Sequence, residues 1–191
     1  AGRDVVATVD PVSPDVGYRS VREVPLSAFD AAIVSTPDAA KLEILAYLLG
    51  HGKHVLVEKP LLVTRTEELE NLARLARTTG AVCYTAYNHR FEPPFVRMKE
   101  SLDSGRLGCI YLCRMFYGNG TARDVRQSAW RDGGAGVLTD LGSHLLDTAL
   151  FWFGALDETF TLGAANRFEN QARDHVAFAS TTKFDGHGQR P

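Results

Sequence analysis

The sequence predicts an α/β protein in two parts: a truncated Rossmann-type, doubly wound parallel sheet, followed by an α+β domain with a largely antiparallel open sheet. Three observations in the 191-residue chain support this prediction. Short apolar runs alternate with amphipathic helical patterns in the first half. Each of these apolar runs ends in polar residues. Two longer runs near the end of the chain follow each other directly, as neighbouring antiparallel strands do.

Four short runs of small and β-branched residues predict the parallel strands of the first part, because such runs are typical of strands covered on both faces. Two helices with apolar stripes alternate with them, which predicts right-handed connections and helices on both faces of the sheet. The second helix should begin at a capping box that pairs Thr64 with Glu67 and end at Gly80. We expect strands over 5–9, 31–35, 54–57 and 81–86, and helices over 39–49 and from 64–67 onward.

The pattern changes after Phe91, which divides the chain into a Rossmann-type part over 1–87 and a second part over 88–191. The segment 107–117 carries apolar residues at both alternating sets of positions and predicts a strand buried on both faces. The elements expected in the second part are a helix over 92–104, that strand, a polar loop over 118–132, a glycine-led helix ending at Gly154, and antiparallel strands over 159–168 and 175–182.

The composition is that of an ordinary globular protein, with 45% apolar and 23% charged residues. A net charge of −2 argues against a nucleic-acid partner or an anionic membrane surface, and no apolar run reaches the length of a membrane span. The three cysteines lack a Cys-x-x-Cys spacing, which predicts neither a disulfide framework nor a zinc site and fits a cytoplasmic location.

The polar residues at the ends of the predicted strands are the first candidates for a site, because ligands of open α/β sheets bind beyond the carboxyl ends of the strands. The alternative is a set of solvated turns. Pro60 cannot continue a strand, and its bond to Lys59 can be cis, which would aim Lys59 into the crevice. Asp10 is placed either to bind a ribose hydroxyl or to cap a turn. The candidates at these ends are Asp10, Thr36, Glu58, Lys59 and the run 87–90.

A second group of candidates lies further along the chain. Asp140 and His144 are four residues apart on a predicted helix, and a carboxylate beside an imidazole suits proton transfer. The same spacing also fits a simple surface pair, and no third residue at a telling spacing predicts a metal site. Trp130 and Arg131 lie in the predicted loop, where they could clamp a ligand or anchor the loop.

Five motifs occur in a characteristic order, although none of them is decisive alone. They are Thr36-Pro37-Asp38, Gly52-Lys53-His54-Val55-Leu56-Val57-Glu58-Lys59-Pro60, Tyr87-Asn88-His89-Arg90-Phe91, Trp130-Arg131, and Gly133-Gly134-Ala135-Gly136-Val137-Leu138-Thr139-Asp140-Leu141-Gly142-Ser143-His144. Together they make the chain resemble the glucose–fructose oxidoreductase / inositol dehydrogenase / rhizopine catabolism (Gfo/Idh/MocA) family, from residue 5 to about residue 182.

The resemblance implies an enzyme that oxidises a secondary alcohol of a sugar, cyclitol or nucleotide-sugar by hydride transfer to NAD or NADP. His144 would be the general base, Lys59 would hold the substrate oxygen, and Asp140 would orient both substrate and base. Arg90, Asp140 and His144 would meet the substrate. An acid at Asp10 would favour NAD. The expected cofactor-binding residues are Asp10, Thr36, Pro37, Glu58, Lys59, Asn88, Trp130 and Arg131.

Two other interpretations stay open: a non-catalytic ligand-binding or regulatory protein on the same fold, and a redox-neutral glycosidase or lyase with a transient NAD-dependent oxidation. The presence of Lys59, Asp140 and His144 argues against the first. The expected partners are a small polyol or sugar and, in the full-length protein, further copies of the chain that associate through the C-terminal sheet.

The chain departs from the family pattern in two respects, and its C-terminal end also lacks an expected element. Asp38 and Lys41 stand where the family usually has Asn and His. No Gly-x-Gly-x-x-Gly loop occurs, so we expect the first strand and the phosphate-binding loop to be missing ahead of Val5. The hairpin signal Asp185-Gly186 is followed by too few residues for a returning strand.

A missing first strand has consequences for the chain by itself. We expect it to be inactive, to bind a dinucleotide weakly and to fold poorly. We also expect a gap or an abnormal pairing beside the strand over 5–9, and lost pairing for the strand over 81–86 or its neighbours.

Overall fold

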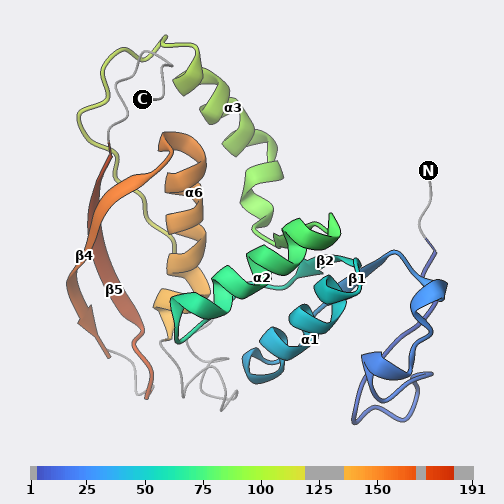
Figure 1. Cartoon of the computed structure of the whole chain (residues 1–191). Coiled ribbons are helices and arrows are strands. Elements are labelled where there is room, and N and C mark those ends of the chain that lie inside the picture. The colour runs from blue at the N-terminus through green and yellow to red at the C-terminus, as the bar shows by residue number, and fades with distance from the viewer. Residues whose placement is uncertain (1–3, 119–135, 167–170, 183–191) are drawn as a thin grey trace. The chain divides into compact units, whose positions relative to one another are not determined.

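The computed structural model describes residues 4–118, 136–166 and 171–182 of the chain (Figure 1). The chain divides into two compact units, Ala1–Ala86 and Tyr87–Pro191. Within the described ranges, no helix is both long enough and apolar enough to span a bilayer.

The first unit is built on a three-stranded parallel sheet. Two short 3-10 helices, η1 (Val21–Glu23) and η2 (Leu26–Ala28), precede it. The strands are β1 (Ala31–Val34), β2 (His54–Val57) and β3 (Cys83–Thr85), and they lie side by side in that order. Three of the four predicted parallel strands are thereby confirmed.

Two helices, α1 (Asp38–Gly50) and α2 (Thr66–Thr79), connect these strands and lie next to each other (Figure 1). Their apolar faces bury a single core with the sheet. Complete burial of one aliphatic side chain of this size stabilises a fold by about 1.5–3 kcal/mol. The core consists of Val34, Leu45, Leu48, Leu49, Val55, Val57, Leu72 and Ala81.

The other face of the sheet is open among the described residues, which corrects the prediction of helices on both faces. Ile33, Leu56 and Tyr84 are 76%, 40% and 37% exposed there. The reason is topological. Both connections step in the same direction along the sheet, and right-handed connections then place both helices on one face.

The predicted strand over 5–9 is wrong. It makes only one isolated bridge, between Val9 and Tyr18, and Val5 and Val6 are 83% and 59% exposed. A strand needs a neighbour to satisfy its backbone groups, and this run joins neither described sheet. The expected gap in the pairing is therefore present. In the described sheet, β1 and β3 each pair on one side only, with β2.

Glu68, and not Glu67, caps the first turn of α2. Its carboxylate accepts hydrogen bonds from the backbone N–H groups of Thr64 (3.1 Å) and Arg65 (3.2 Å). These bonds, that from Arg65 foremost, hold the pKa of Glu68 below its usual value. The predicted capping box was one residue out of register because the N-cap residue is Arg65. The helix ends as predicted at Gly80, which takes the left-handed φ of 73°.

We expect Glu68→Gln to lower the urea midpoint of unfolding, and Glu67→Gln to leave it nearly unchanged. The neutral amide accepts the two N–H groups less strongly than a carboxylate does. Because the pKa of Glu68 is depressed in the folded chain, the stabilisation is present above the unfolded pKa and is lost as the pH falls through the folded pKa. The difference between the variants should therefore shrink on acidification below the usual pKa of 4.5. Equal midpoints at neutral pH would contradict the assignment.

The second unit combines helices with a two-stranded antiparallel sheet, in which Ala165 lies opposite His175. The helix ending at Gly154 and the two antiparallel strands are confirmed. Helix α6 packs against both α3 and η3. The elements are η3 (Asn88–Phe91), α3 (Pro93–Asp103), the single π-helical turn η4 (Leu138–Gly142), α6 (Ser143–Phe153), β4 (Leu156–Ala165) and β5 (His175–Thr182).

The predicted strand over 107–117 is also wrong. The segment has no regular structure, and Tyr111, Leu112 and Phe116 are 94%, 69% and 91% exposed. An alternating apolar pattern becomes a buried strand only where a ladder partner and covering layers exist. The described residues provide neither for this segment. The predicted loop over 118–132 lies outside the described residues from 119 onward.

Candidate functional site

The carboxyl ends of β1 and β2 bring predicted site residues to one edge of the sheet. The two strands run in register, and the N–H of Glu58 donates to the carbonyl of Val34 at 2.9 Å. Thr36 lies two residues beyond β1, and Lys59 lies two residues beyond β2. The peptide bond between Lys59 and Pro60 is cis, as the sequence allows. This edge is the place where an open parallel sheet binds its ligand.

The hydroxyl of Thr36 is buried at this edge and has no hydrogen-bond partner within the described part of the chain. Such buried hydroxyls are rare in native folds and cost about 1–3 kcal/mol each. Pro37, the N-cap residue of α1, has no backbone donor that could satisfy it. The arrangement fits a polar ligand group at Thr36 and is compatible with the predicted cofactor lining.

Asp10 caps a turn, which was the alternative to a ribose contact. Its Oδ1 accepts hydrogen bonds from the backbone N–H groups of Val12 (2.7 Å) and Ser13 (2.8 Å). These bonds, that from Ser13 foremost, lower the pKa of Asp10. The guanidinium of Arg19 donates to the carbonyls of Asp10 (3.3 Å) and Ser13. The ribose contact stays a prediction, and an ionised carboxylate suits both roles.

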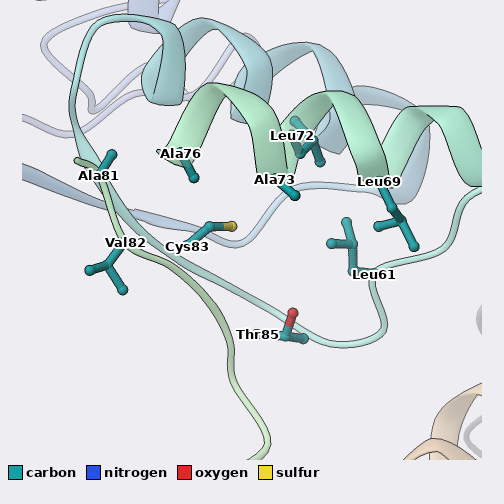
Figure 2. A pocket seen from close by; sticks show the side chains of 9 residues that line it. All are labelled: Leu61, Leu69, Leu72, Ala73, Ala76, Ala81, Val82, Cys83 and Thr85. Atoms are coloured by element: carbon teal, nitrogen blue, oxygen red, sulfur yellow. The ribbon is translucent and has the colours of Figure 1, made fainter. Parts of the chain in front are cut away.

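An apolar pocket of about 420 Å³ lies between α2 and β3 (Figure 2). Figure 2 shows side chains from α2 pointing toward Cys83. Burial raises the pKa of the Cys83 thiol, which keeps it protonated at neutral pH. The pocket holds none of the predicted site residues, so its apolar lining extends the core. Its lining consists of Leu61, Leu69, Leu72, Ala73, Ala76, Ala81, Val82, Cys83 and Thr85.

In the second unit, rings surround the predicted base His144. This residue is 7% exposed. The imidazole of His89 stacks on it, with centroids 4.5 Å apart and planes 30° apart. Tyr87 and Tyr117 approach edge-on, with centroid distances of 5.8 and 6.0 Å, and burial raises the pKa of Tyr87. The imidazole of His144 is thus held in one orientation in a site largely closed to water.

Asp140 lies on η4, the π-helical turn directly before α6. The single helix predicted from Gly136 onward is therefore two elements, and Asp140 and His144 stand on either side of their junction. π-helical turns are uncommon in proteins, and those that occur often lie at functional sites. Gly136, two residues before this turn, has a φ of 61°, and any Cβ there would collide with the carbonyl oxygen of Arg173. Only glycine fits this approach.

Arg90, which was predicted to meet the substrate, forms a bidentate ion pair with Asp147 of α6. Its Nε donates to the two carboxylate oxygens at 3.0 and 2.8 Å, and its Nη2 donates to Oδ1 at 2.7 Å. The guanidinium also lies over the ring of Phe151, 5.4 Å from its centroid. Asp147 is buried. The structure therefore gives Arg90 a structural partner, and its substrate contact stays a prediction.

The two contacts of η3 with α6 come from consecutive residues. His89 stacks on His144, and Arg90 pairs with Asp147 one helical turn further on. Asn88, predicted to line the cofactor, donates its Nδ2 to Glu92 at 3.1 Å. The segment that follows the first unit is thereby docked on the helix that carries His144.

Sequence reasoning missed the roles of His89, Tyr117 and Lys41. His89 lies within a quoted motif, so a signal existed, whereas Tyr117 was assigned to a strand. Lys41 is charged, but it stands one helical turn before Leu45 on the buried face of α1. Trp130 and Arg131 lie outside the described residues. Within the described ranges, no three His, Cys, Asp or Glu side chains are grouped as metal ligands would be.

Comparison with family models covers most of the chain. Residues 6–87 match the model of an oxidoreductase family with an NAD-binding Rossmann fold, and residues 95–188 match the model of a Gfo/Idh/MocA C-terminal domain. A curated relative, the scyllo-inositol 2-dehydrogenase (NADP(+)) IolW of Bacillus subtilis, is 34% identical over 130 residues. The match covers 66% of this chain and 36% of that relative, so the chain spans about a third of the relative's length.

Two solved structures share the fold. An inositol dehydrogenase homolog from Azotobacter vinelandii, complexed with NADH and myo-inositol, has 25% identity and a TM-score of 0.67. It covers 80% of this chain, which spans 41% of that one. The WlbA dehydrogenase from Bordetella pertussis, in complex with NADH and UDP-GlcNAcA, has 21% identity and a TM-score of 0.71 over 88% of this chain and 53% of its own. These likenesses confirm the predicted fold class.

Proposed function

Because the chain belongs to the Gfo/Idh/MocA family of oxidoreductases, we propose that it acts as an NAD(P)-dependent dehydrogenase on a secondary alcohol of a sugar, cyclitol or nucleotide-sugar. The observation that supports this most is the buried, ring-enclosed imidazole of His144. The substrate class follows from the names of the relatives and solved structures, which act on or bind inositols and a nucleotide-sugar.

In the proposed reaction, His144 accepts the proton of the substrate hydroxyl at a ring nitrogen. Lys59 donates a hydrogen bond to the same oxygen and stabilises the charge that develops there. Asp140 orients the substrate and the base. As the proton leaves, the carbinol carbon gives up its hydride, so that the alcohol becomes a ketone. Bound NAD(P) supplies the hydride acceptor.

We assign most of the cofactor-binding residues to the part over 1–87 and the substrate-binding residues Arg90, Asp140 and His144 to the part over 88–191. The buried hydroxyl of Thr36 supports the cofactor assignment. The residues proposed to hold the cofactor are Asp10, Thr36, Pro37, Glu58, Lys59, Asn88, Trp130 and Arg131.

We expect the full-length protein to prefer NAD over NADP. By full-length protein we mean the longest form that its gene encodes. The ionised carboxylate of Asp10 would accept hydrogen bonds from the ribose diol and repel a 2′-phosphate. Two arginines could otherwise receive a 2′-phosphate, but both have other contacts. Arg19 donates to the carbonyls of Asp10 and Ser13, and Arg22 pairs with Glu43 at 3.0 Å. The measurement is the ratio of kcat/KM for the two cofactors. Asp10→Ser should reduce this ratio, and Asp15→Ser, a matched exposed control, should not. A tenfold bias of the unaltered protein toward NADP would overturn the expectation.

Absorbance at 340 nm, recorded with NAD or NADP and a panel of polyols and nucleotide-sugars, tests the proposed function. A dehydrogenase accumulates reduced cofactor in step with substrate loss. A redox-neutral glycosidase or lyase converts its substrate without net reduced cofactor, and a non-catalytic binding protein converts nothing. Either of the last two results would replace the proposal.

Two further expectations accompany the proposed function. We propose that copies of the full-length protein associate through the C-terminal sheet, where Leu162 of β4 is 65% exposed. We also propose a cytoplasmic location, because all three cysteines are free.

A further inference from the structure

We propose that Lys41 and Asp38 are positioning residues for Lys59, because their ion pair holds the carbonyl group of Pro60, the residue directly after Lys59. The inference rests on the proposed function, in which Lys59 contacts the substrate. It adds two residues that no predicted site contains.

The contacts of Lys41 join two separate elements. Its Nζ donates to Oδ1 of Asp38 at 2.7 Å and to the carbonyl oxygen of Pro60 at 2.9 Å. Lys41 is only 4% exposed, and lysine is almost never buried to this degree unless its ammonium is paired. The side chain therefore ties the first turn of α1 to the turn that follows β2.

A second ion pair on α1 shows the ordinary alternative. Arg22 meets Glu43 at 3.0 Å, with side chains 56% and 78% exposed, and exposed pairs of this kind contribute little to stability. The Lys41 side chain is only 5% exposed and has a second acceptor outside its own helix. A local helix-stabilising role would need neither burial nor that second contact.

The restraint acts on the backbone from which Lys59 projects. A lysine ammonium sits on a flexible four-carbon stem, so its position depends on where that stem begins. Proline fixes its own φ, and a held carbonyl at Pro60 therefore restrains the turn that starts at Lys59. A shift of about 1 Å in a reacting group can cost about a hundredfold in rate. Without Lys41, the carbonyl of Pro60 and the carboxylate of Asp38 would both lose their cation.

In the full-length protein, we expect Lys41→Met to lower kcat by about ten- to a hundredfold, with a change in substrate KM below about threefold. Lys41→Arg keeps the charge, but its planar guanidinium does not reproduce both contacts, so this variant should also lose turnover. It tests the inference even if Lys41→Met fails to fold. Adding Asp38→Asn to Lys41→Met should cause little further loss, because the two residues act as one unit. Glu43→Gln on the same helix is the matched control and should keep the original kcat.

Hydrogen exchange followed by mass spectrometry tests the restraint without any enzymatic activity. Lys41→Met should speed exchange of the amides over 58–62 by at least about threefold, and Glu43→Gln should not. If exchange is faster in Lys41→Met but the original protein shows no dehydrogenase activity, the proposed function is wrong. The restraint on the Pro60 turn would still stand. Unchanged exchange, or a turnover of Lys41→Met and Lys41→Arg within about twofold of the original protein, would overturn the inference.

Discussion

Lys59→Ala is expected to reduce the turnover of the full-length protein by at least about a hundredfold, the usual contribution of a positioned acid–base group. Lys59 stands beyond β2 at the carboxyl edge of the sheet, where open α/β sheets generally bind their ligands. Alanine removes the only part of the residue that could hold the substrate oxygen, and it leaves the strand and the Pro60 turn in place. Initial rates at saturating substrate and cofactor provide the measurement.

Lys53→Ala is the matched control for this variant. Lys53 stands just before the opposite end of β2, where its Nζ donates to the carbonyl of Phe29 at 2.8 Å. It has the same charge and nearly the same place in the chain, but it lies away from the carboxyl edge. Its loss should lower stability slightly and leave turnover within about threefold of the original value. Equal turnover of both variants would remove Lys59 from the mechanism.

Asp147→Ala should lower the free energy of unfolding by about 3–5 kcal/mol, the cost of breaking a buried ion pair on one side. Its carboxylate accepts three close hydrogen bonds from Arg90, whose side chain is 31% exposed. Removing the carboxylate leaves a partly buried guanidinium without its counter-charge. Urea unfolding of the full-length protein, followed by far-ultraviolet circular dichroism, measures the change.

The control for this change is Asp103→Ala, because Asp103 pairs with Lys99 on the surface of α3 and is 51% exposed. A pair of that kind contributes about 0–1 kcal/mol. In the double variant Arg90→Ala/Asp147→Ala, part of the lost stability should return, since no unpaired charge remains. Losses of equal size at Asp147 and Asp103 would show that the buried pair does not stabilise the second unit.

Local signals were sufficient for much of the first unit. The apolar runs and the stripes of α1 and α2 predicted β1, β2, β3 and both helices, because spacing along the chain determines which side chains share a face. The glycine that ends α2 was equally visible. Thr36, Glu58 and Lys59 could be placed at one sheet edge because parallel strands end together.

Interactions between distant residues could not be predicted in this way. The runs over 5–9 and 107–117 have the composition of strands, but strand formation depends on a partner that no local pattern supplies. Arg90 and Asp147 are 57 residues apart, and the burial of Lys41 follows from an acceptor on another element. The stacking of His89 on His144 likewise arises only when η3 docks on α6.

Following the transferred hydride with a deuterium label tests the proposed function most directly. A substrate that reduces the cofactor is deuterated at its carbinol carbon and incubated with the full-length protein, and the reduced cofactor is analysed by mass spectrometry. We expect one deuterium on the nicotinamide ring for each molecule of ketone formed, and much slower transfer in Lys59→Ala and His144→Asn. Substrate conversion that leaves the deuterium in the product, or that releases it into water, would contradict hydride transfer as the reaction of this protein.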